Sequence, residues 1–410
     1  MPTIRRRQRS AVPEDGSTAP PNPSRSTRAT RSASRQQQTP PEEPREPQSP
    51  ARRTEVVVEK EDSEDDEEDA ATKSPGRHVA IVQSPKPTNS GAPGTALPLT
   101  LPVPPVLHFP LVAVGSLCIM SMGYSVVREY TGSAAEYVSV TRPLATWGEV
   151  ALLASWRIFE LALGWYGNFD SYDLAALAAL SHGPTLYLLH AFYGISLSTT
   201  ISSLFVEILS TFVPFRLLRS VSDPHSVHPS ESLAAPNKAV ISDHLIQLLT
   251  TGLAAGIYGV TILAAFSTYL PTCLVLYFKN IPSIEAAHVL SVAPLVPVMV
   301  LFGLASRVYI FTPSAAQGVT EADAKADKFD PVQANLKETL RWNLWGWHTS
   351  TKVGIKRTAV AALMSGVHTT LQLVYGIKGI EATGAAAYAA VWVVAAVVTG
   401  FGLGAVGSEG

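Results

Sequence analysis

The sequence predicts an all-α fold, in which a polytopic bundle of transmembrane helices follows a disordered N-terminal tail. Two observations lead to this prediction. All 33 aromatic residues lie in residues 106–410, while residues 1–105 contain 18 of the 31 prolines. Residues 106–410 also hold only 16 Lys/Arg and 18 Asp/Glu, and their long apolar runs suit a bilayer. This distribution excludes a wholly soluble enzyme, a secreted disulfide scaffold and a nucleic-acid-binding globular protein.

The tail at residues 1–105 is predicted to be disordered because it has almost no apolar surface to bury. Burial would have to offset about 1–2 kcal/mol of backbone entropy per ordered residue. An arginine-rich start, interpreted as a solvated charge run rather than a lipid-binding patch, precedes an acidic block at residues 59–69 (EKEDSEDDEED). An acidic or proline-directed context marks four candidate phosphorylation sites: Ser49, Ser63, Ser74 and Ser84. We expect this tail to recruit protein partners.

The domain at residues 106–410 contains seven runs that are long and apolar enough to cross a ~30 Å hydrocarbon core. Two of these runs are long enough to be split, so about seven crossings are predicted, with a range of six to eight. No apolar h-region precedes the first run, so we expect the first helix itself to direct membrane insertion. The runs are Val106–Val127, Thr146–Tyr166, Leu174–Leu218, Ala239–Phe278, Ala286–Phe311, Thr358–Ile377 and Ala382–Val406.

The side of the membrane that holds the tail depends on how the run Leu174–Leu218 is divided. With seven crossings, the loops richest in Lys/Arg face the cytosol and the tail lies outside. Splitting this run, which Gly183-Pro184 interrupts, places the tail on the Lys/Arg-rich side instead. No Asn-x-Ser/Thr sequon with a non-proline middle residue occurs in the chain. We therefore expect a cytosolic tail on a protein of the endoplasmic reticulum or nuclear envelope.

A polar stripe on the second predicted helix is the best candidate for an intramembrane site. Glu149, Arg157 and Glu160 lie within one broad face at 100° per residue, and Glu207 and Arg307 are candidate partners from other runs. Charges at bilayer depth are costly unless they are paired or hydrated. The stripe therefore indicates either an ion, proton or substrate pathway, or a structural Arg157–Glu160 pair with Glu149 near the headgroups.

A soluble or interfacial loop is predicted at residues 312–357. Within it, leucines and valine recur every four residues from Val332 to Leu344, which predicts an amphipathic helix beginning near Asp330-Pro331. Tryptophans and basic residues surround it, so we expect it either to lie on anionic lipid or to dock on the protein's own cytosolic face. The candidate lipid contacts are Lys337, Arg341, Trp342, Trp345, Trp347, Lys352, Lys356 and Arg357.

The chain contains no motif that predicts a metal, a cofactor or a catalytic centre. Its membrane histidines are scattered singly, and the HxxH of His225 and His228 lies in a polar loop. Neither of the two cysteines, which fall in different runs, supports a disulfide or a zinc site. Gly252 and Gly256 form a GxxxG motif, which we expect to pack helices within the bundle rather than to form a dimer.

Two segments resemble multipass membrane proteins predicted from fungal genomes that have no assigned function. They are Glu338–Thr358 (ETLRWNLWGWHTSTKVGIKRT) and the closing GIEATGAAAYAAVW. The resemblance implies an endomembrane protein and supplies no site residues. Three functions remain open. The first, which we favour, is a non-catalytic membrane protein whose tail and interfacial helix recruit partners or lipid. The second is a transporter or channel that uses the polar stripe, and the third is a lipid-modifying enzyme.

Overall fold

The computed structural model describes residues 104–132, 134–226, 237–284, 292–330 and 334–408. The chain divides into two units, residues 1–76 and 77–410, and every described residue belongs to the second. The tail predicted at residues 1–105, with its four candidate phosphorylation sites, therefore lies almost wholly outside the described residues. Within the described ranges the fold is all-helical apart from two isolated β-bridges, which confirms the predicted all-α class.

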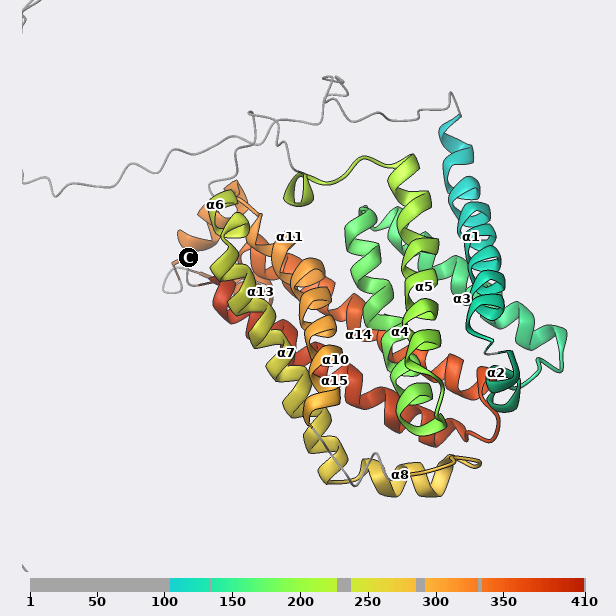
Figure 1. Cartoon of the computed structure of the whole chain (residues 1–410). Coiled ribbons are helices and arrows are strands. Elements are labelled where there is room, and N and C mark those ends of the chain that lie inside the picture. The colour runs from blue at the N-terminus through green and yellow to red at the C-terminus, as the bar shows by residue number, and fades with distance from the viewer. Residues whose placement is uncertain (1–103, 133, 227–236, 285–291, 331–333, 409–410) are drawn as a thin grey trace, which may run out of the picture. The chain divides into compact units, whose positions relative to one another are not determined.

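Eight long helices make up the described bundle, and shorter helices connect them (Figure 1). The π-helical turn Arg307–Phe311 joins α10 to the short helix α11, so these three elements form one continuous rod. The long helices are α1 (His108–Thr131), α3 (Trp147–Tyr166), α4 (Ser171–Tyr193), α5 (Leu197–Leu218), α7 (His244–Ser267), α10 (Val292–Ser306), α14 (Thr349–Gly376) and α15 (Ala382–Ser408). The short ones are α2 (Ala134–Val140), α6 (Lys238–Ser242), α8 (Leu270–Tyr277), α11 (Thr312–Ala315), α12 (Glu321–Asp327) and α13 (Leu336–Trp345).

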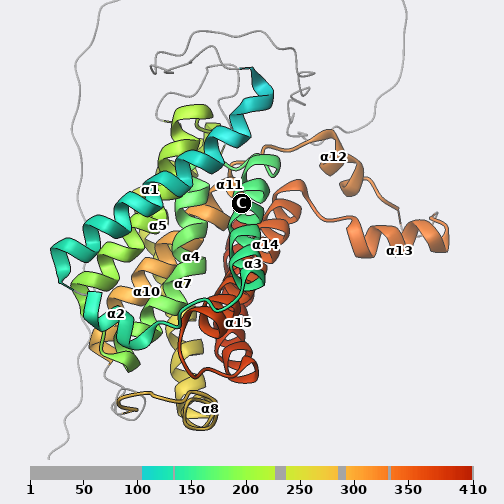
Figure 2. The ribbon, with the colours of Figure 1, turned by 90° about the vertical axis from the view of Figure 1, so that its right-hand side faces the viewer.

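Five helical segments of the described chain are long and apolar enough to cross a membrane. They are Pro105–Thr131, Leu197–Leu218, His244–Ser267, Leu295–Ala315 and Ala382–Gly407. The other long helices, α3, α4 and α14, carry more charged and polar residues but lie among these five in the bundle (Figures 1 and 2). The chain is thus a membrane protein by the length and composition of its helices.

The run Leu174–Leu218 forms two helices, but it does not break where the sequence suggested. Gly183 and Pro184 lie inside α4, where Gly183 contacts the Phe302 ring and the Pro184 carbonyl accepts a hydrogen bond from Tyr388. The break comes at Gly194, whose φ of 72° ends α4 in the left-handed region that favours glycine. The Ser196 side chain then caps α5. The run Ala239–Phe278 instead gives one long helix, α7, and the short α8, which lies across one end of the bundle (Figure 1).

The connections between the long helices gather at two opposite ends of the bundle. The end where α1 begins, called the proximal end here, also holds the α3–α4 turn and the segment after α5, which are joined by hydrogen bonds from Ser222 to Asp170. The opposite, distal end holds α2, α8 and the α14–α15 turn. There, Lys378 N–H donates to the Val140 carbonyl and Glu381 N–H donates to the Tyr277 carbonyl. The eight long helices therefore run alternately between the two ends.

Helix α4 forms the centre of the bundle and buries 18 of its 23 residues. A helix that is covered all round can be apolar on every face. It packs against α5, α10 and α14, and the large side chains of Phe192, Tyr258, Phe302 and Trp392 fill the adjoining core. The polar residues that α4 nevertheless carries, His182 among them, are consequently held deep in the structure.

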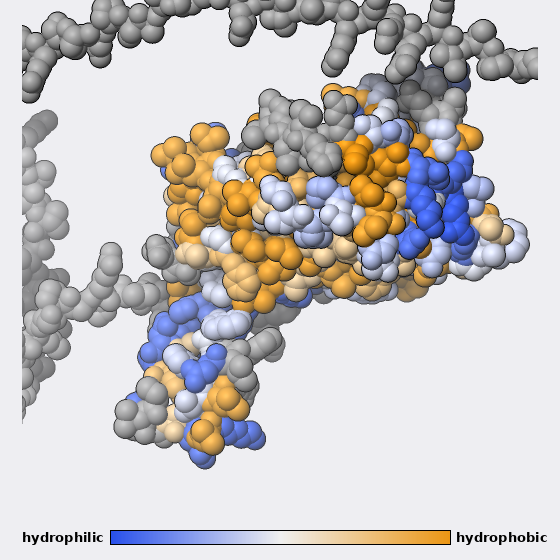
Figure 3. Space-filling view, turned by 90° about the horizontal axis from the view of Figure 1, so that it is seen from below, coloured by the Kyte–Doolittle hydropathy of each residue, from blue (hydrophilic) through white to orange (hydrophobic). Residues whose placement is uncertain are grey.

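The outer surface of the bundle is strongly apolar. Large side chains such as Leu248, Val260 and Phe401 are exposed, and Figure 3 shows apolar residues over much of the described surface seen from below. A surface of this kind suits lipid better than water. The expected internal packing at the GxxxG motif is wrong, because a Cβ at Gly252 or Gly256 would meet no described atom within 4 Å. Both glycines are exposed on α7, whereas Gly259, about two turns after Gly252, is buried against Met299.

Candidate functional site

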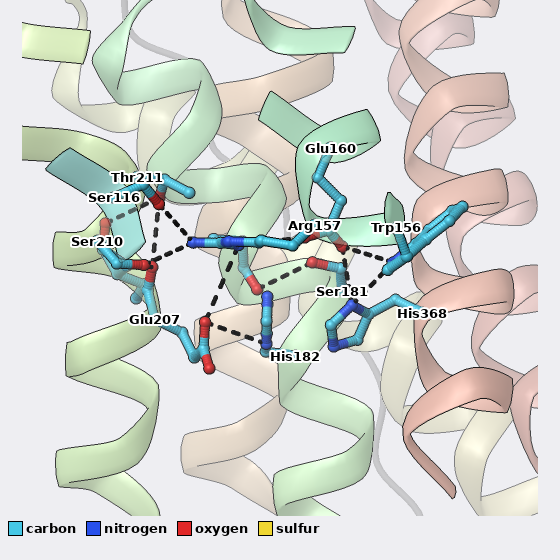
Figure 4. Close-up of polar contacts among 12 residues, drawn as sticks. Ser116, Trp156, Arg157, Glu160, Ser181, His182, Glu207, Ser210, Thr211 and His368 are labelled. Atoms are coloured by element: carbon cyan, nitrogen blue, oxygen red, sulfur yellow. Dashed lines mark hydrogen bonds and ion pairs between the residues drawn. The ribbon is translucent and has the colours of Figure 1, made fainter. Parts of the chain in front are cut away.

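The Arg157 guanidinium is the centre of a buried polar network in the middle of the bundle (Figure 4). Arg157 lies on α3 and is only 8% exposed. Its Nη1 donates to Glu160 Oε2 at 3.1 Å and lies 4.0 Å from Glu207 Oε2. Its Nη2 donates to Ser210 Oγ at 2.6 Å on α5 and to Ser116 Oγ at 3.1 Å on α1. One cation thus joins three helices and two carboxylates.

Glu160 connects this guanidinium to α14. Its second oxygen, Oε1, accepts a hydrogen bond from the Trp156 indole at 2.9 Å and lies 2.8 Å from His368 Nδ1. Trp156 is one turn before Glu160 on α3, so their side chains lie on the same helix face. His368 is 2% exposed and comes from a part of the chain more than 200 residues away. Both oxygens of this carboxylate therefore have partners.

Glu207 forms the other half of the network. Its Oε1 accepts a hydrogen bond from the Tyr124 hydroxyl at 2.6 Å, and its Oε2 lies 3.6 Å from His182 Nδ1 on α4. The His182 and His368 rings are in contact, with centroids 3.9 Å apart. The two carboxylate–imidazole pairs consequently lie against each other at the place where α3, α4, α5 and α14 meet (Figure 4).

Several polar atoms of this network have no hydrogen-bond partner among the described residues. They include Nε2 of both His182 and His368 and Nε of Arg157. A buried donor or acceptor without a partner costs about 1–3 kcal/mol. A cavity of about 20 Å³ adjoins the same groups and is lined by Arg157, Glu160 and His182, together with apolar residues of α4 and Met364. It has room for one water molecule or one metal ion.

The network contains two carboxylates and one guanidinium. Glu160 and Glu207 share the positive charge of Arg157, and His182 and His368 add positive charge only when they are protonated. Buried carboxylates are costly unless they are paired, so a cation that binds beside them is stabilised. The arrangement can therefore hold a cation, and its imidazoles and carboxylates are groups that bind metal ions in proteins.

A second polar cluster lies at the proximal end, outside the apolar part of the bundle. Asp170 caps α4, and its Oδ2 accepts hydrogen bonds from Ser222 Oγ at 2.5 Å and Ser222 N at 3.1 Å. His225 Nδ1 lies 2.8 Å from the same oxygen. Burial alone would lower the pKa of His225, but the hydrogen bond to Asp170 and its negative charge outweigh burial and raise that pKa. Burial would likewise raise the pKa of Asp170, yet the His225 hydrogen bond and charge lower it well below its usual range.

Arg357 fixes α14 to α4 beside this cluster. Its guanidinium donates to both oxygens of Asp173, at 2.6 and 2.9 Å, and to the Tyr309 carbonyl at 2.9 Å. The carbonyl belongs to the π-helical turn, in which the Arg307 carbonyl is bonded by Thr312 N–H, five residues on. The Phe169 and Tyr309 rings each lie 5.1 Å from the guanidinium carbon. Arg357 therefore links α14 to α4 inside the protein and does not face lipid as the sequence suggested.

The structure brings together three of the four residues proposed for the intramembrane site: Arg157, Glu160 and Glu207. Glu149 lies elsewhere, at the start of α3, where its carboxylate pairs with Arg142 at 2.5 Å and accepts a hydrogen bond from the Ala145 N–H. Arg307, a candidate partner, lies in the π-helical turn and makes none of the network's contacts that the structure describes. The alternative of a simple Arg157–Glu160 pair is therefore too narrow, because Glu207 shares the same guanidinium.

The interfacial candidates divide into exposed and enclosed residues. Lys337, Trp342, Trp347 and Lys356 are exposed, and Lys352 is half-buried. Trp342 stacks on Phe329 with ring centroids 4.9 Å apart and donates its indole N–H to the Ala326 carbonyl. The side chains of Arg341 and Trp345 lie outside the described residues.

The sequence missed His182, His368 and Tyr124 as members of the network. The two histidines are 186 residues apart, so no spacing along the chain links them. Burial is the signal that could have identified the two histidines as site candidates, since each lies near the middle of a long helix whose flanking residues are apolar or small.

No protein-family model matches this chain, and neither a curated protein nor a solved structure matches it.

Proposed function

We propose that this protein is an integral membrane transporter of cations and that the buried network around Arg157 is its cation site. The observation that supports this most is that Glu160 and Glu207 share one guanidinium beside two imidazole nitrogens without a described partner, deep in the bundle between helices of alternating direction. A bundle that needed only rigidity would be served as well by apolar side chains, because burying charges costs desolvation free energy.

The arrangement of the two ends supports a specific topology with eight crossings. We propose that α3, α4 and α14 cross the bilayer with the five more apolar segments. Ten Lys/Arg of residues 106–410 then lie at or near the proximal end, against four at the distal end. By the positive-inside rule the proximal end is cytosolic, and the tail that precedes α1 lies on the same side. The endoplasmic reticulum or nuclear envelope stays our prediction for the membrane itself.

The proposal is tested by measuring cation-driven charge movement in proteoliposomes on a solid-supported membrane. Rapid jumps in H⁺, Na⁺, K⁺, Mg²⁺ or Zn²⁺ concentration should produce a transient current with at least one of these cations. Glu207→Gln should reduce that current by more than about tenfold, because it removes one negative charge from the network. Glu149→Gln is the matched control, since Glu149 lies on α3 outside the network, and it should leave the current unchanged. A wild-type protein that is silent to all five cations would refute transport.

A second role for the same chain is the contact of α13 with anionic lipid. Leu336, Leu340 and Trp342 are 82, 58 and 41% exposed on this helix, and Figure 2 shows α12 and α13 extending away from the long helices. Apolar side chains beside the exposed Lys337 are typical of a helix at the membrane interface. Hydrogen exchange of residues 334–348 in nanodiscs should be slower with anionic than with zwitterionic lipid. Equal exchange in both would exclude this contact.

A further inference from the structure

We infer that Glu160, His182 and His368 form a binding site for one transition-metal dication of the Zn²⁺ class. The inference rests on the proposed function, because it names the cargo of the same network. Each of the three residues is buried, and each offers one ligand atom, with all three atoms within 4.8 Å of one another. The ligands of a tetrahedral Zn²⁺ lie about 2.0–2.2 Å from the metal, so they are about 3.3–3.5 Å apart. These side chains would have to move to reach that geometry, because Glu160 Oε1 and His368 Nδ1 lie 2.8 Å apart in a hydrogen bond.

The surroundings of these three residues have the form of an outer coordination shell. Metal-binding histidines usually direct their other ring nitrogen at a carboxylate, and metal-binding carboxylates are themselves hydrogen-bonded. His182 Nδ1 faces Glu207 Oε2 at 3.6 Å. Glu160 accepts hydrogen bonds from the Trp156 indole and the Arg157 guanidinium. Glu160 Oε1 also lies 2.8 Å from His368 Nδ1. These contacts orient the candidate ligands and leave Nε2 of each histidine without a described partner.

Two unused donor atoms give a second, independent reason for a ligand. Nε2 of His182 and Nε2 of His368 are both buried, and neither has a hydrogen-bond partner among the described residues. The residues themselves are 7 and 2% exposed. An imidazole nitrogen in this situation loses hydration and gains nothing in return, unless a metal ion or another ligand binds it. The cavity that adjoins Glu160 and His182 is large enough for one ion.

The donor set selects the class of metal. Two imidazoles and one carboxylate suit Zn²⁺ and neighbouring first-row dications. Mg²⁺ and Ca²⁺ prefer oxygen ligands, and Cu⁺ prefers sulfur. The two carboxylates of the network attract a cation, while the Arg157 charge 3.1 Å from Glu160 limits how tightly a dication is held. Moderate affinity is what a transport site requires, because the ion must also leave.

The proximal cluster does not compete for this assignment. Asp170, Asp173 and His225 also have ligand atoms within 4.8 Å of one another. However, both Asp173 oxygens are bound by Arg357, and the Asp170 oxygens accept hydrogen bonds from Ser222, His225 and the Asp173 N–H. Hydrogen bonds would have to be displaced at Glu160 as well, but the proximal cluster offers one imidazole, His225, where the network offers two.

The test measures Zn²⁺ binding to the purified full-length protein in detergent, by chelator competition and by metal analysis after desalting. We expect one Zn²⁺ per chain. His182→Gln and His368→Gln should each weaken binding by more than about tenfold, as loss of a ligand requires. His244→Gln is the matched control, because His244 is an exposed histidine at the start of α7, and it should bind like the wild type. Binding that survives both network variants would overturn the assignment.

X-ray absorption on the Zn²⁺-loaded wild type covers the case in which a network variant fails to fold. It should show two imidazoles and oxygen at about 2.0–2.2 Å, with no sulfur. A spectrum without imidazole scattering, or no stoichiometric Zn²⁺ at all, would refute the site. These readouts need no transport. Zn²⁺ bound in a protein that gives no cation-driven current would refute only the transport proposal, and a current without Zn²⁺ at these residues would refute only the metal assignment.

Discussion

Replacing Arg157 with methionine should destabilise the bundle more than any other single change in the network. The variant removes one guanidinium and leaves two carboxylates without it, since Arg157 contacts both Glu160 Oε2 and Glu207 Oε2. Two serine hydroxyls lose their donor as well. Removing one partner of a buried ion pair costs about 3–5 kcal/mol. We expect a loss at the upper end of that range, because two carboxylates are stranded.

A double-mutant cycle with Glu160→Gln measures how much of this loss belongs to one pair. Glu160→Gln alone should cost about 1.5–3 kcal/mol, the usual value of a hydrogen bond to a charged group. The double variant should be less destabilised than the sum of the single variants, by about 1–3 kcal/mol. It should nevertheless stay well below the wild type, because Glu207 still lacks its cation. Adding Glu207→Gln should then recover stability.

The assay is reversible unfolding in mixed micelles by titration with denaturing detergent, followed by tryptophan fluorescence. The control cycle is Arg142→Met with Glu149→Gln, a half-buried pair at the start of α3, which should couple by only about 0.2–1 kcal/mol. The reasoning fails if Arg157→Met costs less than about 1 kcal/mol. It also fails if the network double variant is additive within about 0.3–0.5 kcal/mol, the range expected for independent sites.

Three further predictions concern the proximal end and the tail. The pKa of His225 is raised, so the stability that its contact with Asp170 contributes is complete below about pH 6.5 and is lost as pH rises through the raised pKa. The pKa of Asp170 is lowered, so the stability that its carboxylate contributes is complete above about pH 4 and is lost as pH falls through the lowered pKa. Tryptic cleavage in residues 219–226 should therefore accelerate at alkaline pH, and His225→Gln should abolish the acceleration beyond that of trypsin itself. Arg357→Met should cost about 3–5 kcal/mol in the same unfolding assay, while the exposed neighbour Lys356→Met should change stability by less than about 0.5 kcal/mol. In intact microsomes, added protease should digest the tail and spare the bundle, and protection of the tail would contradict a cytosolic side.

The sequence was sufficient to predict the class of fold and the positions of most long helices. The apolar runs coincide with α1, α3, α7, α14 and α15, because a run of about 20 apolar residues has few alternatives to a membrane helix. It was insufficient to place the break between α4 and α5. Pro184 was a plausible helix breaker, but the surrounding helices accommodate it, while Gly194 supplies the conformation that ends α4.

The site was only partly predictable, because helix periodicity shows which face of a helix a residue lies on but not which residues of other helices lie at the same level. Glu149 and Arg157 share a face of α3, but eight residues at 1.5 Å per residue separate them by about 12 Å along the helix. Glu149 consequently reaches the distal end, where Arg142 is available. Arg157 and Glu160 lie about one turn apart and stay together. His182 and His368 could not be assigned, since their contact depends on how α4 and α14 pack.

The two polar clusters differ in their position in the bundle and in the number of imidazole nitrogens that lack a described partner. At the proximal end every carboxylate oxygen of Asp170 and Asp173 has a partner, and one buried imidazole nitrogen, Nε2 of His225, has none among the described residues. The deeper network has two such nitrogens, Nε2 of His182 and of His368, beside two carboxylates that share one guanidinium. Electrostatics alone would favour apolar replacements there. A cation bound by the two nitrogens would complete the network, which is the property that the proposed transport site needs and a purely structural ion pair does not.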